Sequence, residues 1–129
     1  MTTDLRIGVV GAGLMGADHV ARITHRISGA VVSAIVEPDP GRAAAAAEKA
    51  PGAATFSRVE DAIAAGALDA VLIATPGQFH APVLIPALEA GLPILCEKPL
   101  TPDSATSWDI IQREQKLDKP HIQIGFMRR

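Results

Sequence analysis

Three glycines with the spacing G-x-G-x-x-G, in the stretch IGVVGAGLMG, constrain the fold of this chain more than any other feature. They directly follow an apolar run and open a stretch whose apolar residues recur at helical spacing. In such a strand–turn–helix unit the glycines permit a tight turn, a close approach of the backbone to a pyrophosphate, and close packing of the helix on the strand. A tight turn without a ligand would also use glycine, but the context favours a dinucleotide site. The predicted cofactor-binding residues at this turn are Gly11, Gly13, Leu14, Met15 and Gly16.

Short apolar runs alternate with longer amphipathic stretches along the whole chain. Most of the short runs are apolar throughout and rich in valine and isoleucine, which is typical of strands covered on both faces. Regular alternation of strand and helix predicts an α/β fold with a doubly wound parallel sheet, the Rossmann architecture. The length of 129 residues predicts a single domain over residues 1–129. The predicted strands are 5–10, 30–36, 70–75, 93–96 and 121–126, with a weaker candidate at 53–56.

Helix boundaries carry their own signals. Asp39 followed by Pro40 predicts an N-cap with proline at the first helical position. Residues 57–60 have the spacing of a capping box, and Thr101-Pro102 repeats the cap-plus-proline pattern before a helix that contains Trp108 and Ile111 at i,i+3 spacing. Helices are predicted to stop near Gly29, Gly66 and Gly91.

The bulk composition argues against several classes of partner. A formal net charge of −2 and a pI near 6.0 give no electrostatic case for nucleic acid or an anionic membrane. No apolar run approaches the ~18 residues of a membrane span, and no signal-peptide pattern precedes the first apolar run. The single cysteine, Cys96, cannot form an internal disulfide and fits a reducing cytoplasm. We therefore expect a cytoplasmic domain without a metal site.

An acidic residue after the second predicted strand bears on the choice of cofactor. Glu37 stands about twenty residues beyond the last glycine of the turn, where a carboxylate would accept hydrogen bonds from the adenosine ribose hydroxyls. A carboxylate there repels a 2′-phosphate, which favours NAD over NADP. Arg42 leaves NADP as an alternative cofactor, because a nearby arginine can bind the extra phosphate. A helix arginine that only contacts solvent would give the same sequence pattern.

The loops after the strands are the other candidate site segments, because doubly wound sheets bind ligands outside the carboxyl ends of their strands. Thr75 and Pro76 are predicted to face the cofactor opposite the glycine turn, although a loop that merely starts the next helix would also contain them. His80 belongs to the predicted cofactor-binding set as well, while packing or capping is the commoner use of a histidine in the first turn of a helix.

The segment CEKP places two adjacent charges at the end of the fifth strand. Lys98 projects into the predicted crevice, where it is a candidate catalytic acid/base; a solvated loop lysine is the alternative. A lysine serves as a base near neutral pH only if its pKa falls from about 10.4 towards 7–8, which a nearby nicotinamide cation would promote. Glu97 is expected to point away from Lys98, towards the ribose or amide of the cofactor. Cys96 is read as a buried apolar residue.

Together, GVVGAGLMGADHV, ATPGQFH, CEKPLT and IGFMRR resemble the glucose–fructose oxidoreductase / inositol dehydrogenase / MocA (Gfo/Idh/MocA) family, and most closely its inositol 2-dehydrogenase-like members. The resemblance covers essentially the whole chain. It implies a nicotinamide-dependent oxidoreductase of a polyol or sugar, in which Lys98 is the catalytic lysine and Glu97 lies near the nicotinamide ribose. It also implies a second α/β domain with the substrate-binding residues and an Asp and a His that complete the catalytic group, which these 129 residues do not include. Gly77 departs from the family, whose members commonly have Asn there.

Two functions from different classes follow. The first is the N-terminal NAD(P)-binding domain of a dehydrogenase acting on CH–OH groups, with the isolated chain inactive because the walls of the substrate site are missing. The second is a non-catalytic dinucleotide-binding module or a truncated fragment without turnover. Because truncation would expose an apolar face, we also expect a homo-oligomer.

Overall fold

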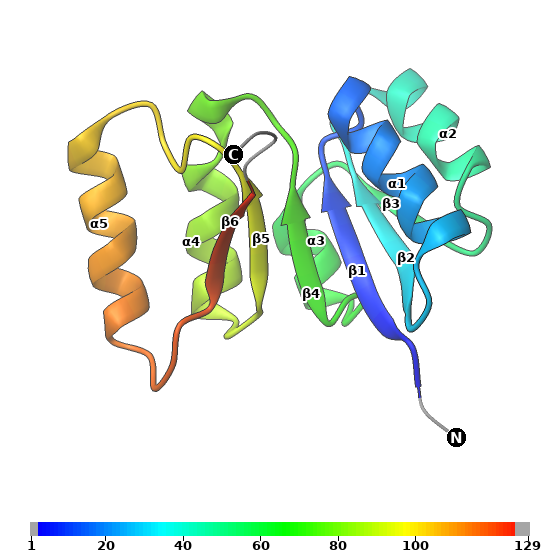
Figure 1. Cartoon of the computed structure of the whole chain (residues 1–129). Coiled ribbons are helices and arrows are strands. Elements are labelled where there is room, and N and C mark those ends of the chain that lie inside the picture. The colour runs from blue at the N-terminus through cyan, green and yellow to red at the C-terminus, as the bar shows by residue number, and fades with distance from the viewer. Residues whose placement is uncertain (1–2, 126–129) are drawn as a thin grey trace.

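The structure of the chain is built on six short strands that all run parallel in one sheet (Figure 1). The strands are β1 (Leu5–Val10), β2 (Ala30–Val36), β3 (Ala54–Phe56), β4 (Ala70–Ile73), β5 (Ile94–Glu97) and β6 (Ile122–Gly125). Their order across the sheet is β3-β2-β1-β4-β5-β6. The chain therefore starts at the centre, moves outward to β3, and returns beside β1 to build the other half. This reversal confirms the predicted doubly wound α/β fold. The computed structural model describes residues 3–125.

The helices form a layer on each face of the sheet (Figure 1). They are α1 (Leu14–Arg26), α2 (Pro40–Glu48), α3 (Val59–Ala64), α4 (Ala81–Glu89) and α5 (Ser104–Gln115), with a 3₁₀ turn η1 (Gly77–Phe79). Helices α1 and α2 pack on the β1–β3 half of one face, while α3, α4 and α5 cover the opposite face. Right-handed crossovers place consecutive helices of each half on the same side.

Two hydrophobic clusters, one on each face, hold these layers together. Val9 and Val10, adjacent in β1, are both buried and point into different clusters. A central strand of a parallel sheet is covered on both faces and so needs apolar residues at every position, rather than at alternate ones. The apolar character of the central runs is thus explained.

Most of the predicted boundaries are confirmed, and three details are wrong. Asp39 caps α2, where its side chain accepts a hydrogen bond from the Arg42 amide at 2.8 Å. The spacing of residues 57–60 is not a capping box, because α3 begins after Arg58 without a side-chain cap. Helix α5 is capped by Asp103, whose carboxylate accepts from the Thr106 amide at 2.7 Å, and not by the preceding Thr-Pro pair.

The third detail concerns the face of α5 that packs on the core. Ile110 is fully buried, whereas Trp108 is 57% exposed, so the predicted pair of Trp108 and Ile111 is not the packing face. Thr101, the other residue expected to cap this helix, instead places its hydroxyl 2.6 Å from that of Ser107. The cap of α5 is thus Asp103, two residues after the threonine that the sequence pattern indicated.

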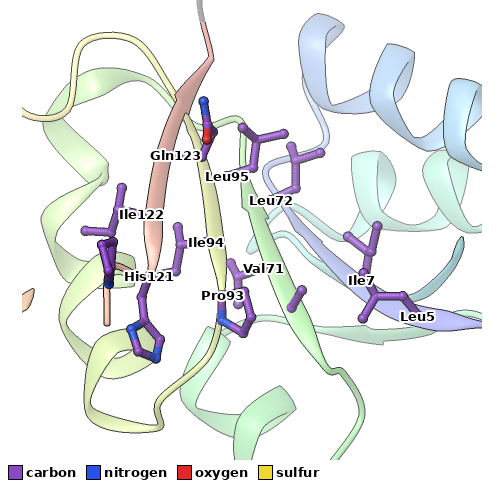
Figure 2. A pocket seen from close by; sticks show the side chains of 12 residues that line it. Leu5, Ile7, Val71, Leu72, Pro93, Ile94, Leu95, His121, Ile122 and Gln123 are labelled. Carbon is purple, nitrogen blue, oxygen red and sulfur yellow. The ribbon is translucent and has the colours of Figure 1, made fainter. Parts of the chain in front are cut away.

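One half of the α1/α2 face carries no helix among residues 3–125. A hollow of about 470 Å³ lies there, over β1 and the strands β4, β5 and β6 (Figure 2). Leu72, Leu95 and Gln123 point into it from three neighbouring strands, and Leu95 is 38% exposed. The expectation that the apolar runs are strands covered on both faces is therefore wrong for β5, whose Leu95 faces this opening.

Candidate functional site

A hollow of about 740 Å³ lies at the carboxyl ends of the central strands. It is bounded by the glycine turn after β1, the end of β2, and the loop after β4. This is the position at which the strand order reverses, where doubly wound sheets bind ligands. The predicted site residues that line it are Gly11, Gly13, Leu14, Met15, Glu37, Thr75 and Pro76.

The glycines of the turn differ in what a side chain would meet. Gly11 has a positive φ of 98°, and a Cβ there would lie 2.9 Å from the Ala74 carbonyl carbon. At Gly16, which is buried under the turn, a Cβ would lie 1.8 Å from the carbonyl oxygen of Gly11. At Gly13 a Cβ would meet nothing within 4 Å, because this residue borders the open pocket. Gly11 thus lets the turn approach the segment after β4, Gly16 lets α1 pack under the turn, and Gly13 leaves room for a ligand.

The first turn of α1 faces the same pocket. Gly13 is the N-cap of this helix and supplies no side-chain cap, and the first turn contains no acidic residue. Leu14, the first helical residue, is exposed at the pocket wall. An uncapped helix N-terminus presents free N–H groups and the positive end of the helix dipole, which suits a phosphate group.

Glu37 has a structural role that the sequence did not indicate. It is buried, with 8% of its surface exposed, and its Oε1 accepts a hydrogen bond from the Ala12 amide at 2.9 Å. Its Oε2 accepts from the Asp39 amide at 3.0 Å. The carboxylate therefore ties the glycine turn to the loop after β2, and each oxygen retains a lone pair for a ligand.

Thr75 carries the polar atom that best marks the site as a binding site. Its Oγ1 is buried and has no hydrogen-bond partner, and the residue lines the pocket. Buried polar atoms are nearly always paired, because an unpaired one costs about 1–3 kcal/mol. A bound ligand with a polar group at this position would supply the partner. With Gly13 open beside it, the pocket fits a dinucleotide.

His80 does not line this pocket. Its side chain is fully buried between the loops after β4 and β5, with Nε2 2.8 Å from the Thr75 carbonyl oxygen and Nδ1 2.8 Å from that of Pro99. The imidazole thus joins the two loops. Gly77 brings them together at a second point, where a Cβ would lie 3.4 Å from Pro99 Cγ.

Glu97 is the last residue of β5, and Lys98 follows it. Lys98 is exposed and precedes Pro99 through a cis peptide bond. Glu97 turns towards α1, where its Oε1 lies 2.7 Å from Nε2 of His19. Sequence reasoning missed His19 as a partner. Its position three residues after Gly16 places it on the sheet-facing side of α1 but does not indicate Glu97 as its partner.

Arg42 lines the pocket as well, and so does Arg58, which the sequence did not single out. Arg58 pairs with Glu60 at 3.0 Å. Both arginines are therefore near the end of β2, at the edge where Glu37 lies. Within residues 3–125 no group of three or more His, Cys, Asp or Glu side chains could hold a metal ion. No helix in that range is long and apolar enough to cross a membrane.

The thiol of Cys96 is fully buried beside His80, with its Sγ 3.3 Å from Nδ1. Burial raises the pKa of this thiol from its ordinary value of 9.0 to about 12, and the nearby charge of Glu97 adds to the rise. The thiol is thus held in its protonated, unreactive form at neutral pH, as expected from the sequence.

This pKa predicts a loss of stability at alkaline pH. A raised folded-state pKa stabilises the fold below about pH 9, and the contribution is lost as the pH rises from 9.0 towards 12. Between about pH 8 and about pH 10, the free energy of unfolding should fall by on the order of 1 kcal/mol more in the wild type than in Cys96→Ala. Urea denaturation of both proteins at both pH values measures this difference. Equal losses in the two proteins would contradict the assignment.

Comparisons with known proteins agree with this geometry. Residues 5–126 match the Gfo/Idh/MocA oxidoreductase family with its NAD-binding Rossmann fold. The chain is 74% identical over 129 residues to an inositol 2-dehydrogenase of Corynebacterium glutamicum (strain R), covering 100% of this chain and 38% of that protein. An inositol 2-dehydrogenase of Leifsonia xyli subsp. xyli is 69% identical over 128 residues, which cover 99% of this chain and 38% of that protein.

A solved structure shows the same arrangement. The crystal structure of myo-inositol dehydrogenase from Lactobacillus casei in complex with NAD(H) and myo-inositol matches with a TM-score of 0.93 at 31% identity. The match covers 98% of this chain and 38% of that one. The chain thus spans well under half the length of these relatives, and the part it matches is their Rossmann domain. It belongs to the Gfo/Idh/MocA oxidoreductase family, as its NAD-binding Rossmann domain.

Proposed function

We propose that residues 1–129 form the dinucleotide-binding domain of an NAD-dependent dehydrogenase that oxidises a polyol or sugar of the inositol type. The observation that carries the cofactor part is the unpaired, buried Oγ1 of Thr75 in the pocket that Gly13 leaves open. The substrate class rests on the relatives, which are inositol dehydrogenases. Because the chain covers 38% of their length, substrate and turnover belong to the whole enzyme.

The chain's own residues have distinct tasks in this proposal. The glycine turn and the first turn of α1 bind the pyrophosphate, and Glu37 accepts hydrogen bonds from the ribose hydroxyls. Thr75 and Pro76 contact the cofactor from the loop after β4. When bound, NAD⁺ supplies the hydride acceptor. Lys98 takes the proton of the substrate hydroxyl at its Nζ as a general base.

Glu37 is expected to set the preference for NAD over NADP. Glu37→Gln keeps the size of the side chain and one acceptor oxygen but removes the charge that repels a 2′-phosphate. The ratio of the dissociation constants for NADP⁺ and NAD⁺ should fall by about tenfold, which corresponds to about 1.4 kcal/mol. NAD⁺ itself should bind several-fold more weakly, because one backbone amide loses its acceptor. Calorimetric titration with both cofactors measures the two constants.

Glu60→Gln is the matched control, since Glu60 also borders the pocket but pairs with Arg58. It should leave the ratio of the two dissociation constants unchanged. An equal change in both variants would mean that the overall charge of the pocket, and not Glu37, sets the preference. Arg42 would then become the residue to replace.

A dinucleotide-binding module without turnover is the second candidate function. The observation in its favour is that Lys98 is exposed to solvent in this chain and does not border the pocket. Assaying NADH formation from NAD⁺ and myo-inositol with the isolated chain tests the second candidate. Turnover by the isolated chain would exclude the second candidate, and binding of NAD⁺ without turnover is the result that we expect of these residues alone.

Partners and location are proposed from the surface. The net charge of −2 gives no patch-forming excess of basic residues, so we infer no binding to nucleic acid or membrane, and we place the protein in the cytoplasm. The open apolar face over β5 favours homo-oligomers.

Light scattering of the purified chain should therefore show dimers or larger species at high concentration. Leu95→Lys, which places a charge on the open face, should shift the distribution towards the monomer. Trp108→Lys removes an exposed apolar residue of α5, away from that face, and should have no such effect. A monodisperse monomer in the wild type would contradict the proposal.

A further inference from the structure

A direct hydrogen bond between two side chains links α1 to β5, the strand that immediately precedes Lys98. Nε2 of His19, in the second turn of α1, lies 2.7 Å from Oε1 of Glu97, the last residue of β5. Helix α1 packs on β1 and β2, whereas β5 lies beyond β4 in the other half of the sheet. The hydrogen bond therefore spans the end of β4 and joins the two halves of the fold.

The chemistry of the two groups decides which of them donates the hydrogen bond. A carboxylate can only accept, so Nε2 of His19 carries the proton and donates. The two side chains are 22% and 20% exposed, so both are mostly shielded from water. A hydrogen bond to a charged acceptor in such a setting is shorter and stronger than one between neutral groups, and it holds Glu97 in one orientation.

That orientation matters for Lys98. Lys98 directly follows Glu97, the last residue of β5, so the two charged groups are adjacent in the chain. Lys98 makes no ion pair with any acidic side chain of residues 3–125, although a carboxylate is its neighbour in sequence. A free Glu97 side chain could swing back to the ammonium group and stabilise its charged form, which a general base must lose.

We propose that His19 is a positioning residue for Lys98. It holds the Glu97 carboxylate on the α1 side and so keeps the ammonium group of Lys98 unpaired. It also holds the end of β5 in place relative to α1, the helix whose first turn faces the pocket. The proposal rests on the proposed function, in which Lys98 is the acid/base and α1 binds the pyrophosphate.

Two neighbouring titratable side chains have partners of their own. On α1, Asp18 pairs with Arg22 at 2.9 Å. On the far side of β5, His80 is buried against Cys96 and the backbone after it. Glu97 is thus the carboxylate whose position decides whether Lys98 is paired.

The titration of Lys98 itself tests the proposal without a substrate or cofactor. The full chain is reductively methylated with ¹³C-formaldehyde, and the dimethylamine resonance of Lys98 is assigned by its loss in Lys98→Arg. The pH midpoint of that resonance is then measured by NMR. Lys49, at the end of α2, serves as an internal reference that no variant should move.

Three variants distinguish a positioning role of His19 from a purely structural one. In His19→Leu the midpoint of Lys98 should rise by on the order of half a pH unit, the size that a partly exposed ion pair supports. His19→Gln retains an N–H donor of similar reach and should restore the wild-type midpoint. In a Glu97→Gln background, His19→Leu should not raise the midpoint of Lys98, because the side chain at position 97 then carries no charge.

An unchanged midpoint in His19→Leu would overturn the proposal, as would a rise that persists in the Glu97→Gln background. If the leucine variant does not fold, His19→Asn, whose shorter side chain does not reach Glu97, makes the same test. Titration of the wild type with NAD⁺ is carried out in parallel. Absence of NAD⁺ binding there would refute the proposed function, whereas the Lys98 midpoints would still decide the role of His19.

Discussion

Replacing Gly16 by alanine is expected to destabilise the fold by at least about 3 kcal/mol. The added Cβ would lie 1.8 Å from the carbonyl oxygen of Gly11 and 2.7 Å from its carbonyl carbon. Both are backbone atoms of the glycine turn, so no side chain can rotate away to make room. Helix α1 would have to move off β1. Because small domains are stable by about 5–15 kcal/mol, this loss should be plain in urea denaturation followed by circular dichroism.

Gly13→Ala is the matched control, since the two glycines belong to the same turn. A Cβ at Gly13 meets nothing within 4 Å, and its φ of −75° is open to any residue. Alanine is a poorer N-cap than glycine, so the cost should stay within about 1 kcal/mol. Similar losses in the two variants would show that α1 can shift to accommodate Gly16→Ala, and that the tight packing under the turn is not required.

Gly13→Val should abolish the binding of NAD⁺ and NADH while the chain remains folded. The side chain of valine would occupy the space at the pocket wall that the glycine leaves open for the pyrophosphate. We expect at least a hundredfold loss of affinity in calorimetric titrations, with the thermal unfolding temperature lowered only slightly. A single substitution would then remove cofactor binding and leave the fold intact.

Gly41→Val controls for the insertion of a branched side chain near a helix start. Gly41 lies in the first turn of α2, is exposed, and does not line the pocket. This variant should bind NAD⁺ as the wild type does. Binding of NAD⁺ by Gly13→Val at wild-type affinity would mean that the pyrophosphate does not approach this turn, and the assignment of the pocket would fail.

The elements whose signals are local could be predicted from the sequence. The glycine turn, the cap at Asp39 and the buried strands depend on residues adjacent in the chain, and the structure has them as predicted. The doubly wound parallel sheet was predicted from the alternation of strand and helix.

The contacts that join distant segments could not be predicted in this way. His19 and Glu97 are far apart in sequence, and nothing near either residue indicates the other. Likewise, the burial of His80 between two loops depends on the course of the chain after β5. The unpaired hydroxyl of Thr75 is visible only when all neighbours are in place. The strands, helices and glycine turn around the site could thus be predicted, whereas the hydrogen bonds between distant segments could not.

The pairing of β1 with β4 has a consequence for how the protein is made. Ile7 to Val10 align with Ala70 to Ile73, which emerge from the ribosome much later, and the backbone of Ala74 forms the wall against which Gly11 packs. A nascent chain that ends before β4 would carry the complete glycine turn and both helices of its half, yet lack the opposite wall of the pocket. Competence to bind the cofactor is therefore acquired only after the second half of the sheet has been synthesised and docked.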